Sequence, residues 1–299
     1  MTSYKPMSDK PSVRSPWFWV PSLYFAQGIP YVAVMIVSVL MYKRLGVSNT
    51  DIALYTSWLN LPWVIKPFWS PFVDLLKTKR WWVVTMQLLI GAGLAGVAFT
   101  IPTTFFFQAS LAVFWLLAFS SATHDIAADG FYMLALDSHE QAFFVGIRST
   151  FYRIAIIAGQ GVLVMFAGFL ENSTGNIPLA WSVTFFILGG LFLALFLYHR
   201  YILPLPKGDK PSATVTPSTI LKEFFATFAS FFKKKQAFVA ILFMLLFGHV
   251  WPVIPVLGRL SGGVTPPADI TGLYILDGLL TGRPAVAWNA FLHLILPAL

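Results

Sequence analysis

The sequence predicts an all-α membrane protein in which a bundle of six helices is followed by a seventh helix and an irregular tail. Of the 299 residues, 57% are hydrophobic and only 11% are charged, whereas soluble domains carry roughly 25% charged residues. The mean hydropathy is +0.73, and several apolar runs reach the length of about 20 residues that a bilayer span needs. The basic residues gather in alternate loops between these runs, which is typical of a multi-pass topology.

The composition also excludes several other classes of protein. The chain has no cysteine, so disulfides, thiolate metal sites and thiol nucleophiles are ruled out. The sequence contains no metal-ligand spacing, nucleotide-binding loop or nucleophile elbow, and we therefore expect neither an enzyme nor a cofactor or metal site. The formal net charge of +8 raises the question of a nucleic-acid partner. The gathering of the basic residues in alternate loops favours the lipid bilayer instead.

Residues 1–16 form a polar and basic tail, which we place in the cytoplasm. The apolar run that follows has no small-residue cleavage site and is too long for a signal peptide, so we expect it to remain as the first span. Six spans of about 20 residues each are predicted for a transporter domain at 17–198. They are Trp17–Met41, Asp51–Phe72, Trp81–Thr100, Thr104–Thr123, Gly146–Leu170 and Ala180–Tyr198.

The loop at 199–236 is longer than the others and strongly basic. Within it, Ser218–Phe232 has apolar residues at helical spacing, and Lys233–Lys235 follow directly. We predict an amphipathic helix that lies on the inner leaflet beside anionic headgroups; a calmodulin-type target helix is the alternative. A seventh span is expected at 237–250, and residues 251–299 are expected to form a periplasmic tail.

The loop charges set the predicted orientation. With the N-terminus inside, the inner loops carry the basic residues of the long loop and of the run 77–80. The outer loops then carry only Lys43 and Arg44. The positive-inside rule therefore places both ends of the six-helix unit in the cytoplasm.

Six spans, a long basic loop and a seventh span form the layout of half a major facilitator transporter, whose halves consist of two inverted three-helix repeats. The inner loop after the second span supports this interpretation. Asp74 ends one predicted helix, and Lys77, Lys79 and Arg80 precede the next. This arrangement resembles the cytoplasmic gate motif of the superfamily, although the usual glycines of that motif are missing.

The most informative polar stretch at membrane depth is Phe119–Leu136. It contains His124, Asp125 and Asp129, and if the fourth helix continues, the i, i+4 spacing places both carboxylates on one face. Ionisable groups in a bilayer are costly and tend to face a partner or a watery cavity. We therefore predict a substrate or proton-coupling site here. The histidine is a candidate proton carrier, and the alternative is a histidine that is simply hydrogen-bonded.

The first two spans supply candidate partners for these carboxylates. Tyr24 and Gln27 offer neutral hydrogen bonds beside a glycine and a proline that interrupt the first helix; a packing kink is the alternative. Lys66 lies deep in the second span. We predict that it pairs with Asp125 or Asp129, or with an anionic substrate, unless it snorkels to the surface.

Arg153 lies about two turns inside the fifth span, and its planar fork suits a carboxylate or a phosphate. We expect an Asp129–Arg153 contact, because the fourth and fifth spans are joined on the cytoplasmic side; the alternative is a structural ion pair that locks the two helices. Arg148 is assigned to the basic rim. In the predicted mechanism, protonation of either aspartate frees Lys66 or Arg153 to exchange partners.

Three motifs resemble the AmpG-type muropeptide permeases of the major facilitator superfamily: YFAQGIPY at 24–31, LPWVIKPFWSPFVD at 61–74 and SATHDIAADGFYMLAL at 121–136. The resemblance covers roughly residues 16–246. It implies proton-coupled symport of anhydro-muropeptides into the cytoplasm for peptidoglycan recycling, by a multi-pass protein of the bacterial inner membrane. By position, the polar family residues fall on Lys66, Asp125, Asp129 and Arg153.

From about His249 the character of the chain changes. PVLGRLSGG, ITGLYILDGLLTG and WNAFLHLILPAL resemble the periplasmic loop of dipeptide/oligopeptide ABC-transporter permeases. We therefore expect a chimera with a seam between Met244 and Arg259, and a transporter that is incomplete, since a full one has about twelve helices. The coupling motif that docks the ATPase in that family is absent, so an ATPase partner is not expected.

Two alternatives to a solute transporter follow from the same residues. The first is an inactive truncated or chimeric membrane fragment that binds no solute, and the second is a peptide ABC permease subunit. Solute binding by the purified chain would favour the transporter over the first alternative. Copurification of an ATPase would favour the second.

Overall fold

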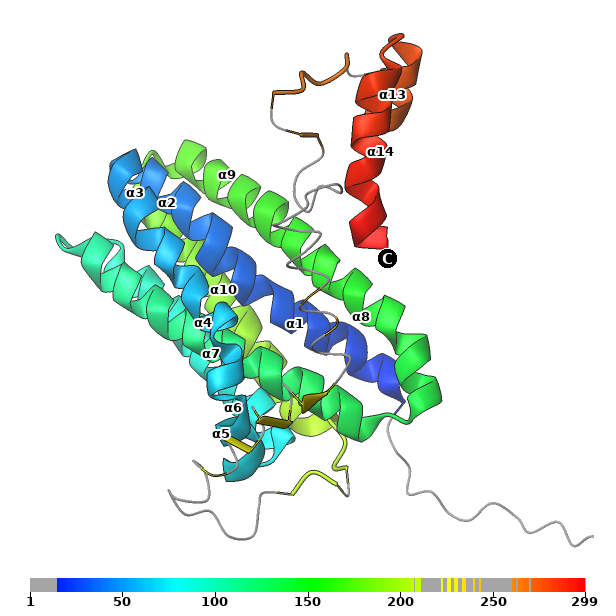
Figure 1. Cartoon of the computed structure of the whole chain (residues 1–299). Helices are drawn as coiled ribbons and strands as arrows, with labels where there is room; N and C mark the ends of the chain where they lie inside the picture. The colour runs from blue at the N-terminus through cyan, green and yellow to red at the C-terminus, as the bar shows by residue number, and fades with distance from the viewer. Residues whose placement is uncertain are drawn as a thin grey trace, which may run out of the picture. The chain divides into compact units, whose positions relative to one another are not determined.

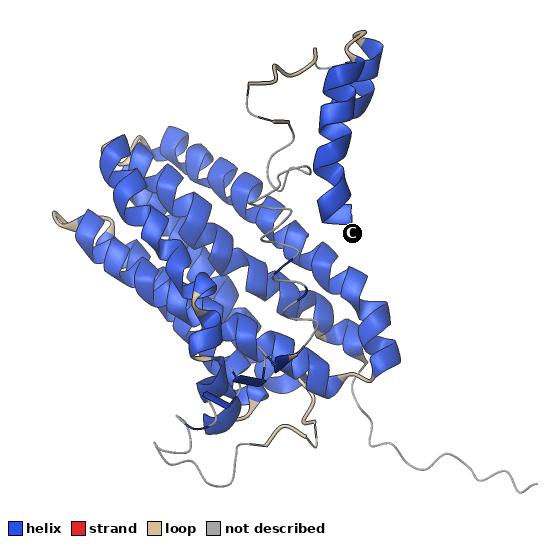
Figure 2. Cartoon of the chain, viewed as in Figure 1, coloured by secondary structure: helices blue, strands red, loops and turns tan. Residues whose placement is uncertain are grey.

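The computed structural model divides into two compact units, Met1–Lys222 and Glu223–Leu299, which we describe separately. The described residues are 15–206, 208–210, 260–261, 263–268 and 270–298, with isolated positions between 222 and 242. Their regular secondary structure is helical, as Figure 2 shows. Three predicted features lie mostly outside the described residues: the tail 1–16, the amphipathic helix Ser218–Phe232 and the seventh span at 237–250.

The first predicted span is confirmed as one continuous helical run, Pro16–Arg44. It consists of η1 (Pro16–Phe18), α1 (Val20–Val32), the π-helical stretch η2 (Ala33–Val37) and α2 (Ser38–Arg44). Pro30 lies inside α1 and cannot donate to the carbonyl one turn earlier. The wider π turn begins three residues later, so the helix accommodates its proline by a bulge and continues.

The second predicted span is not the unbroken helix that we expected. It is divided into α3 (Asn49–Thr56), η3 (Ser57–Asn60), α4 (Leu61–Val64), η4 (Lys66–Phe68) and α5 (Ser70–Leu76). Pro62, Pro67 and Pro71 each stand at the start of one of the last three pieces, because proline is tolerated in a first turn but interrupts a helix interior. In Figure 1 the pieces follow one another along the bundle, and η3, α4, η4 and α5 all contact α7.

Four further helical runs are long and apolar enough to cross a membrane, which confirms the other predicted spans of the bundle. They are α6 (Lys79–Thr100), α7 (Phe106–Ala135), the run of α8 (Ser138–Ala158), η5 (Gly159–Leu163) and α9 (Val164–Thr174), and α10 (Ile177–Ile202). The fourth helix does continue past Thr123, so the whole polar stretch up to Ala135 belongs to α7. Asp137 begins α8 with a capping box that includes Glu140, which fixes the start of the fifth span.

Small residues let the helices of the bundle approach closely. A Cβ atom added at Gly28 of α1 would stand 2.7 Å from the Cβ of Ala155 and 2.9 Å from the carbonyl oxygen of Tyr152 in α8. Between α6 and α10, a Cβ added at Gly189 would stand 3.0 Å from the carbonyl oxygen of Gly91. α6 contacts both α7 and α10, and α1 contacts both α7 and α8. The helix α1 therefore packs beside the part of α7 that carries Asp125 and Asp129.

The predicted irregular tail is partly helical, which corrects that expectation. Two helices, α13 (Tyr274–Leu280) and α14 (Pro284–Ala298), contact each other. The Asp277 carboxylate accepts hydrogen bonds of 2.7 Å from both the N–H and the hydroxyl of Thr271, and these bonds lower the pKa of Asp277. Gly282, with φ of +69°, ends the first helix and permits the turn into the second. The high Gly and Pro content of the tail thus indicates a turn between two helices.

The close contact of α1 with α8 predicts that Gly28→Ala destabilises the bundle, because the new methyl group meets backbone that cannot move aside. We expect a loss of about 1–3 kcal/mol, measured as a lower unfolding temperature of the purified chain in detergent. Gly168→Ala is the matched control, since nothing lies within 4 Å of a Cβ there. That change should be neutral or stabilising by up to about 1 kcal/mol; equal destabilisation by both variants would contradict the close approach.

Candidate functional site

Asp125 of α7 forms an ion pair with a lysine from the broken second span. The Lys66 Nζ atom lies 3.3 Å from Asp125 Oδ2, which confirms one of the two predicted pairings. Lys66 is the first residue of η4, so the break in the helix lets its side chain reach α7. The Asp125 side chain is only 9% exposed and that of Lys66 is 32% exposed. Each charge therefore compensates the other where little water is present.

Asp129, one turn along α7, has different partners. The Tyr24 hydroxyl donates a 3.0 Å hydrogen bond to Asp129 Oδ1, and an Arg148 Nη2 atom lies 3.5 Å from the same oxygen. The Arg148 guanidinium also lies over the rings of Tyr24 and Tyr132, at 4.8 and 5.2 Å from their centroids. Two cation–π contacts and one carboxylate thus hold this arginine between α1, α7 and α8.

The expected Asp129–Arg153 contact is wrong, because Arg148 occupies that place. Five residues along an α-helix correspond to a rotation of about 140°, so Arg148 and Arg153 cannot both face α7. Arg153 is exposed and forms no ion pair with any described residue. Of these two arginines of α8, Arg153 is the one that remains available to a ligand.

A cavity of about 380 Å³ lies between α1 and α8 next to these pairs. Its lining consists of Tyr24, Gln27, Arg148, Ser149, Tyr152 and Arg153. The Oε1 atom of Gln27 is buried without a hydrogen-bond partner among the described residues. The cavity therefore combines one unpaired cation with neutral hydrogen-bonding groups, and two of its lining residues, Tyr24 and Arg148, contact the Asp129 carboxylate.

His124 points away from this cavity. It is fully buried and its Nε2 atom lies 3.0 Å from the Gln87 amide nitrogen. The Gln87 amide oxygen is 3.0 Å from His199 Nδ1, and His199 Nε2 is 3.0 Å from Ser22 Oγ. This chain of hydrogen bonds joins α7, α6, α10 and α1 on the inside of the bundle. The geometry favours the hydrogen-bonding interpretation of His124 over a role as proton carrier.

The predicted gate residues cluster where α5 ends and α6 begins. Lys79 forms an ion pair with Asp74, and Lys77 lies 5.9 Å from the centroid of the Trp81 ring. The stem of Lys79 also covers Gly130, where an added Cβ would stand 2.9 Å from the lysine Cε atom. This lysine therefore ties the turn between α5 and α6 to α7.

A residue beyond α10 joins this cluster of predicted gate residues. The Asp209 carboxylate accepts hydrogen bonds from the backbone N–H groups of Lys79 and Arg80, at 2.6 and 3.0 Å. The Arg80 side chain donates to the carbonyl oxygens of Leu203 and Arg200. These bonds fix the chain that follows α10 against the first turn of α6, which carries unsatisfied donors.

Sequence reasoning missed Asp209, and it assigned Arg148 only to the basic rim. Asp209 lies in a basic loop, about 130 residues from the amides that it binds, and no local pattern marks such a partner. For Arg148 a signal was present, since it precedes the deeper Arg153 in the same span. The pattern could not show which of the two faces α7.

Comparison with known proteins matches the model of the BT1 family to residues 25–260 of the chain. The AmpG 4 protein of Rickettsia conorii is 28% identical over 244 residues, which cover 75% of this chain and 54% of that protein. The anhydromuropeptide permease of Escherichia coli is 24% identical over 233 residues, which cover 75% of this chain and 44% of that permease. The chain thus spans about half the length of these curated relatives.

A second, shorter similarity concerns a different kind of protein. The DdpB permease protein of a D,D-dipeptide transport system in Escherichia coli is 48% identical over 56 residues, or 19% of this chain and 16% of DdpB. This confirms that the chain resembles two families, as its motifs indicated. The longer match agrees with the permease-like motifs at 24–136, and the short match agrees with the resemblance of the tail.

The ion pair between Lys66 and Asp125 predicts strong energetic coupling between the two residues. Asp125→Asn or Lys66→Met alone leaves a charge without its partner, and each should lower the free energy of unfolding by about 1–3 kcal/mol. The double variant should lose less than the sum of the two. A double-mutant cycle from thermal unfolding in detergent measures this coupling.

The matched control for this cycle pairs Asp125→Asn with Lys43→Gln, because Lys43 donates a hydrogen bond to Asn49 in an exposed position. These two changes should add within about 0.5 kcal/mol. Additive behaviour of Lys66 and Asp125 as well would contradict the ion pair.

Proposed function

Because the chain belongs to the BT1 family of the major facilitator superfamily, we propose that its bundle is the amino-terminal half of a permease for proton-coupled import of anhydro-muropeptides. Membership follows from the family match over residues 25–260, and the family is one of transporters rather than enzymes. The substrate is proposed from the similarity to the anhydromuropeptide permease of Escherichia coli. One observation carries the proposal: a cavity at membrane depth with an unpaired arginine lies next to two aspartates that are each paired with a cation.

The unpaired arginine is proposed to recognise the substrate. A muropeptide carries carboxylates on its peptide, and a guanidinium fork binds such a group through two parallel hydrogen bonds. Tyr24, Gln27 and Tyr152 line the same cavity, and their neutral groups suit sugar hydroxyls and amides. In this proposal Arg153 holds a substrate carboxylate while the neutral groups orient the rest of the solute.

The two paired aspartates are proposed to couple this binding to protons. Protonation of Asp129 would release Arg148, and protonation of Asp125 would release Lys66, so that each cation becomes free to change partner. Protonation removes the negative charge that holds the cation, so proton uptake by the aspartate and separation of the pair are linked. Substrate and proton binding would thereby favour the same rearrangement of α1, α7 and α8.

Alternating access requires a second bundle, because the site of such a transporter lies between two halves that rock against each other. The cavity between α1 and α8 would accordingly form one wall of the complete site. Its volume of about 380 Å³ suits one part of a sugar-peptide solute. Transport by the complete protein is therefore proposed as the joint action of this bundle and a second one.

A second candidate function rests on the short match to DdpB. It is a permease subunit of a peptide ABC transporter, which would require an ATPase partner. Copurification of an ATPase with the full chain from a bacterial membrane would favour this candidate. The match covers 16% of DdpB, and we propose it as the weaker of the two.

The role of Arg153 predicts that Arg153→Gln weakens the binding of an anhydro-muropeptide to the purified chain at least tenfold, or about 1.4 kcal/mol. Calorimetric titration in detergent measures the dissociation constant. Arg153→Lys keeps the charge but loses the fork and should show an intermediate loss. Lys43→Gln, at the end of the first span and outside the cavity lining, is the charge-matched control and should bind normally.

Two results of this titration would contradict the proposal. Unchanged binding by Arg153→Gln would remove the arginine from the site. Absence of binding by the unaltered chain would favour the inactive membrane fragment.

The proposed coupling predicts the loss of gradient-driven uptake when both aspartates are neutralised. In a complete transporter that contains this bundle, we expect Asp125→Asn/Asp129→Asn to abolish accumulation of labelled muropeptide in proteoliposomes under an inward proton gradient, because neither of these carboxylates remains to carry the proton. Asp51→Asn, in the exposed first turn of α3, is the control and should retain the activity of the unaltered transporter. Unchanged accumulation by the double variant would refute coupling through these residues.

A further inference from the structure

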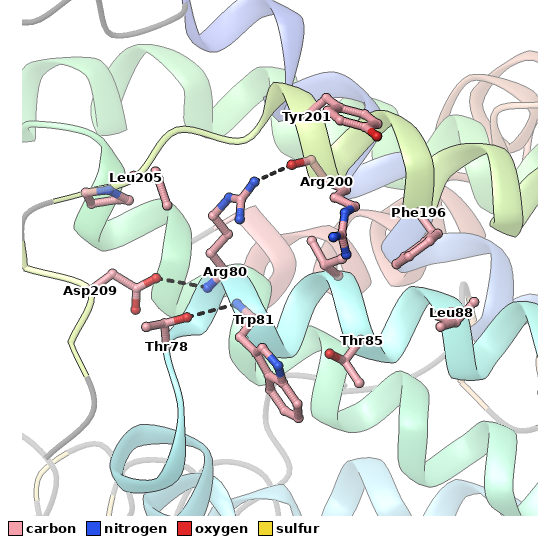
Figure 3. A pocket seen from close by; sticks show the side chains of 12 residues that line it. Thr78, Arg80, Trp81, Thr85, Leu88, Phe196, Arg200, Tyr201, Leu205 and Asp209 are labelled. Atoms are coloured by element: carbon pink, nitrogen blue, oxygen red, sulfur yellow. Dashed lines mark hydrogen bonds between the residues drawn. The ribbon is translucent and has the colours of Figure 1, made fainter.

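A second cavity lies between α6 and α10, at the end of the bundle that the loop charges assign to the cytoplasm. Its volume is about 570 Å³, and it is separate from the cavity between α1 and α8 because the two share no lining residue. Figure 3 shows its side chains, which come from the first three turns of α6, the last turns of α10 and the segment that follows α10. The proposed transport function does not use this cavity.

The polar end of this cavity carries an unpaired cation. Arg200 of α10 extends toward α6 between Arg80 and Phe196 in Figure 3, and its side chain makes no hydrogen bond or ion pair recorded among the described residues. Arg80 adds a second guanidinium, held in place by the backbone carbonyls of Leu203 and Arg200.

One carboxylate also lines the cavity, and its charge is already engaged. Asp209 accepts hydrogen bonds from two backbone N–H groups at the N-terminus of α6, where the helix dipole favours a negative charge. The neighbouring Thr85 hydroxyl takes part in no hydrogen bond recorded for the described residues and faces the same space. The cavity therefore offers the positive charge of Arg200 and a free hydroxyl to an incoming group.

The other end of the cavity is apolar. Leu88 and Phe196 line it, and Leu88 lies eight residues beyond Arg80, which is about 12 Å deeper along the helix axis. Trp81 and Tyr201 stand at the polar end and are 43% and 70% exposed. Aromatic side chains at this position are typical of the headgroup level of a bilayer. The cavity thus runs from headgroup level into the hydrocarbon layer.

We propose that this cavity between α6 and α10 binds an anionic phospholipid of the inner leaflet. The lipid phosphate would lie between Arg200, Arg80 and Thr85, and one acyl chain would run along Leu88 and Phe196. A basic pocket between spanning helices on the cytoplasmic side suits such a headgroup. The gradient from cationic to apolar lining favours a lipid over a soluble phosphate, because a soluble anion would leave the apolar end empty.

Native mass spectrometry of the purified full chain tests this site with phosphatidylglycerol and phosphatidylcholine as probes. We expect the unaltered chain to retain phosphatidylglycerol at least fivefold better than phosphatidylcholine. Arg200→Gln should abolish this preference, because the unpaired cation is lost. Lys210→Gln removes one exposed charge from the same side of the bundle, outside the cavity lining, and should keep the preference.

A second variant tests the cavity independently of its charge. Thr85→Phe fills the space between α6 and α10 without changing the charge and should also reduce the retained phosphatidylglycerol. Retention at the unaltered level by Arg200→Gln or by Thr85→Phe would overturn the proposal, as would an equal loss in Lys210→Gln. The unfolding temperature of each variant in detergent shows that the bundle is folded.

Inorganic phosphate distinguishes a lipid from a soluble anion. Phosphate at millimolar concentration should leave the retained phosphatidylglycerol unchanged, because it cannot replace the acyl-chain contacts. Complete displacement of the lipid by phosphate would identify a site for a soluble anion and overturn the proposal.

Discussion

The pairing of membrane-depth charges along one face of α7 is the interaction on which the arrangement of the bundle depends. An isolated charge at the centre of a bilayer costs about 3 kcal/mol or more. Asp125 meets Lys66 from the broken second span, and Asp129 meets Arg148 from α8. The two pairs therefore fix the position of the second span and of α8 against the same face of α7, one turn apart.

The backbone features of the neighbouring spans follow from these pairings. The prolines that divide the second span bring Lys66 to a break, from which its side chain reaches α7. Gly28 allows α1 to approach α8 closely, and Tyr24 of the same helix then bonds Asp129 and stacks against Arg148. Helix interruptions and small residues, which cost stability in isolation, thus permit the polar contacts of the site.

At the predicted cytoplasmic end, a different set of polar contacts joins segments that are far apart in the sequence. Asp209 binds the first amides of α6, and Lys79 binds Asp74 while covering Gly130. The same turn of α6 borders the cavity between α6 and α10 with its unpaired Arg200. A lipid bound there would contact α6 and α10, the two helices that Asp209 holds together, so lipid composition is expected to influence the stability of this end.

The sequence by itself determined the class of the protein, five of the six bundle spans and the two families that it resembles. Those features depend on composition, on apolar length and on local motifs, which are legible along the chain. It also identified Lys66, Asp125 and Asp129, because charges inside apolar runs stand out against their surroundings. Only the tertiary structure decided that Arg148, not Arg153, meets Asp129, and that His124 faces Gln87 inside the bundle. Successive residues of a helix are rotated by about 100°, so the side chain that faces a neighbour depends on how the whole helix is turned about its axis. Packing between distant segments sets that orientation.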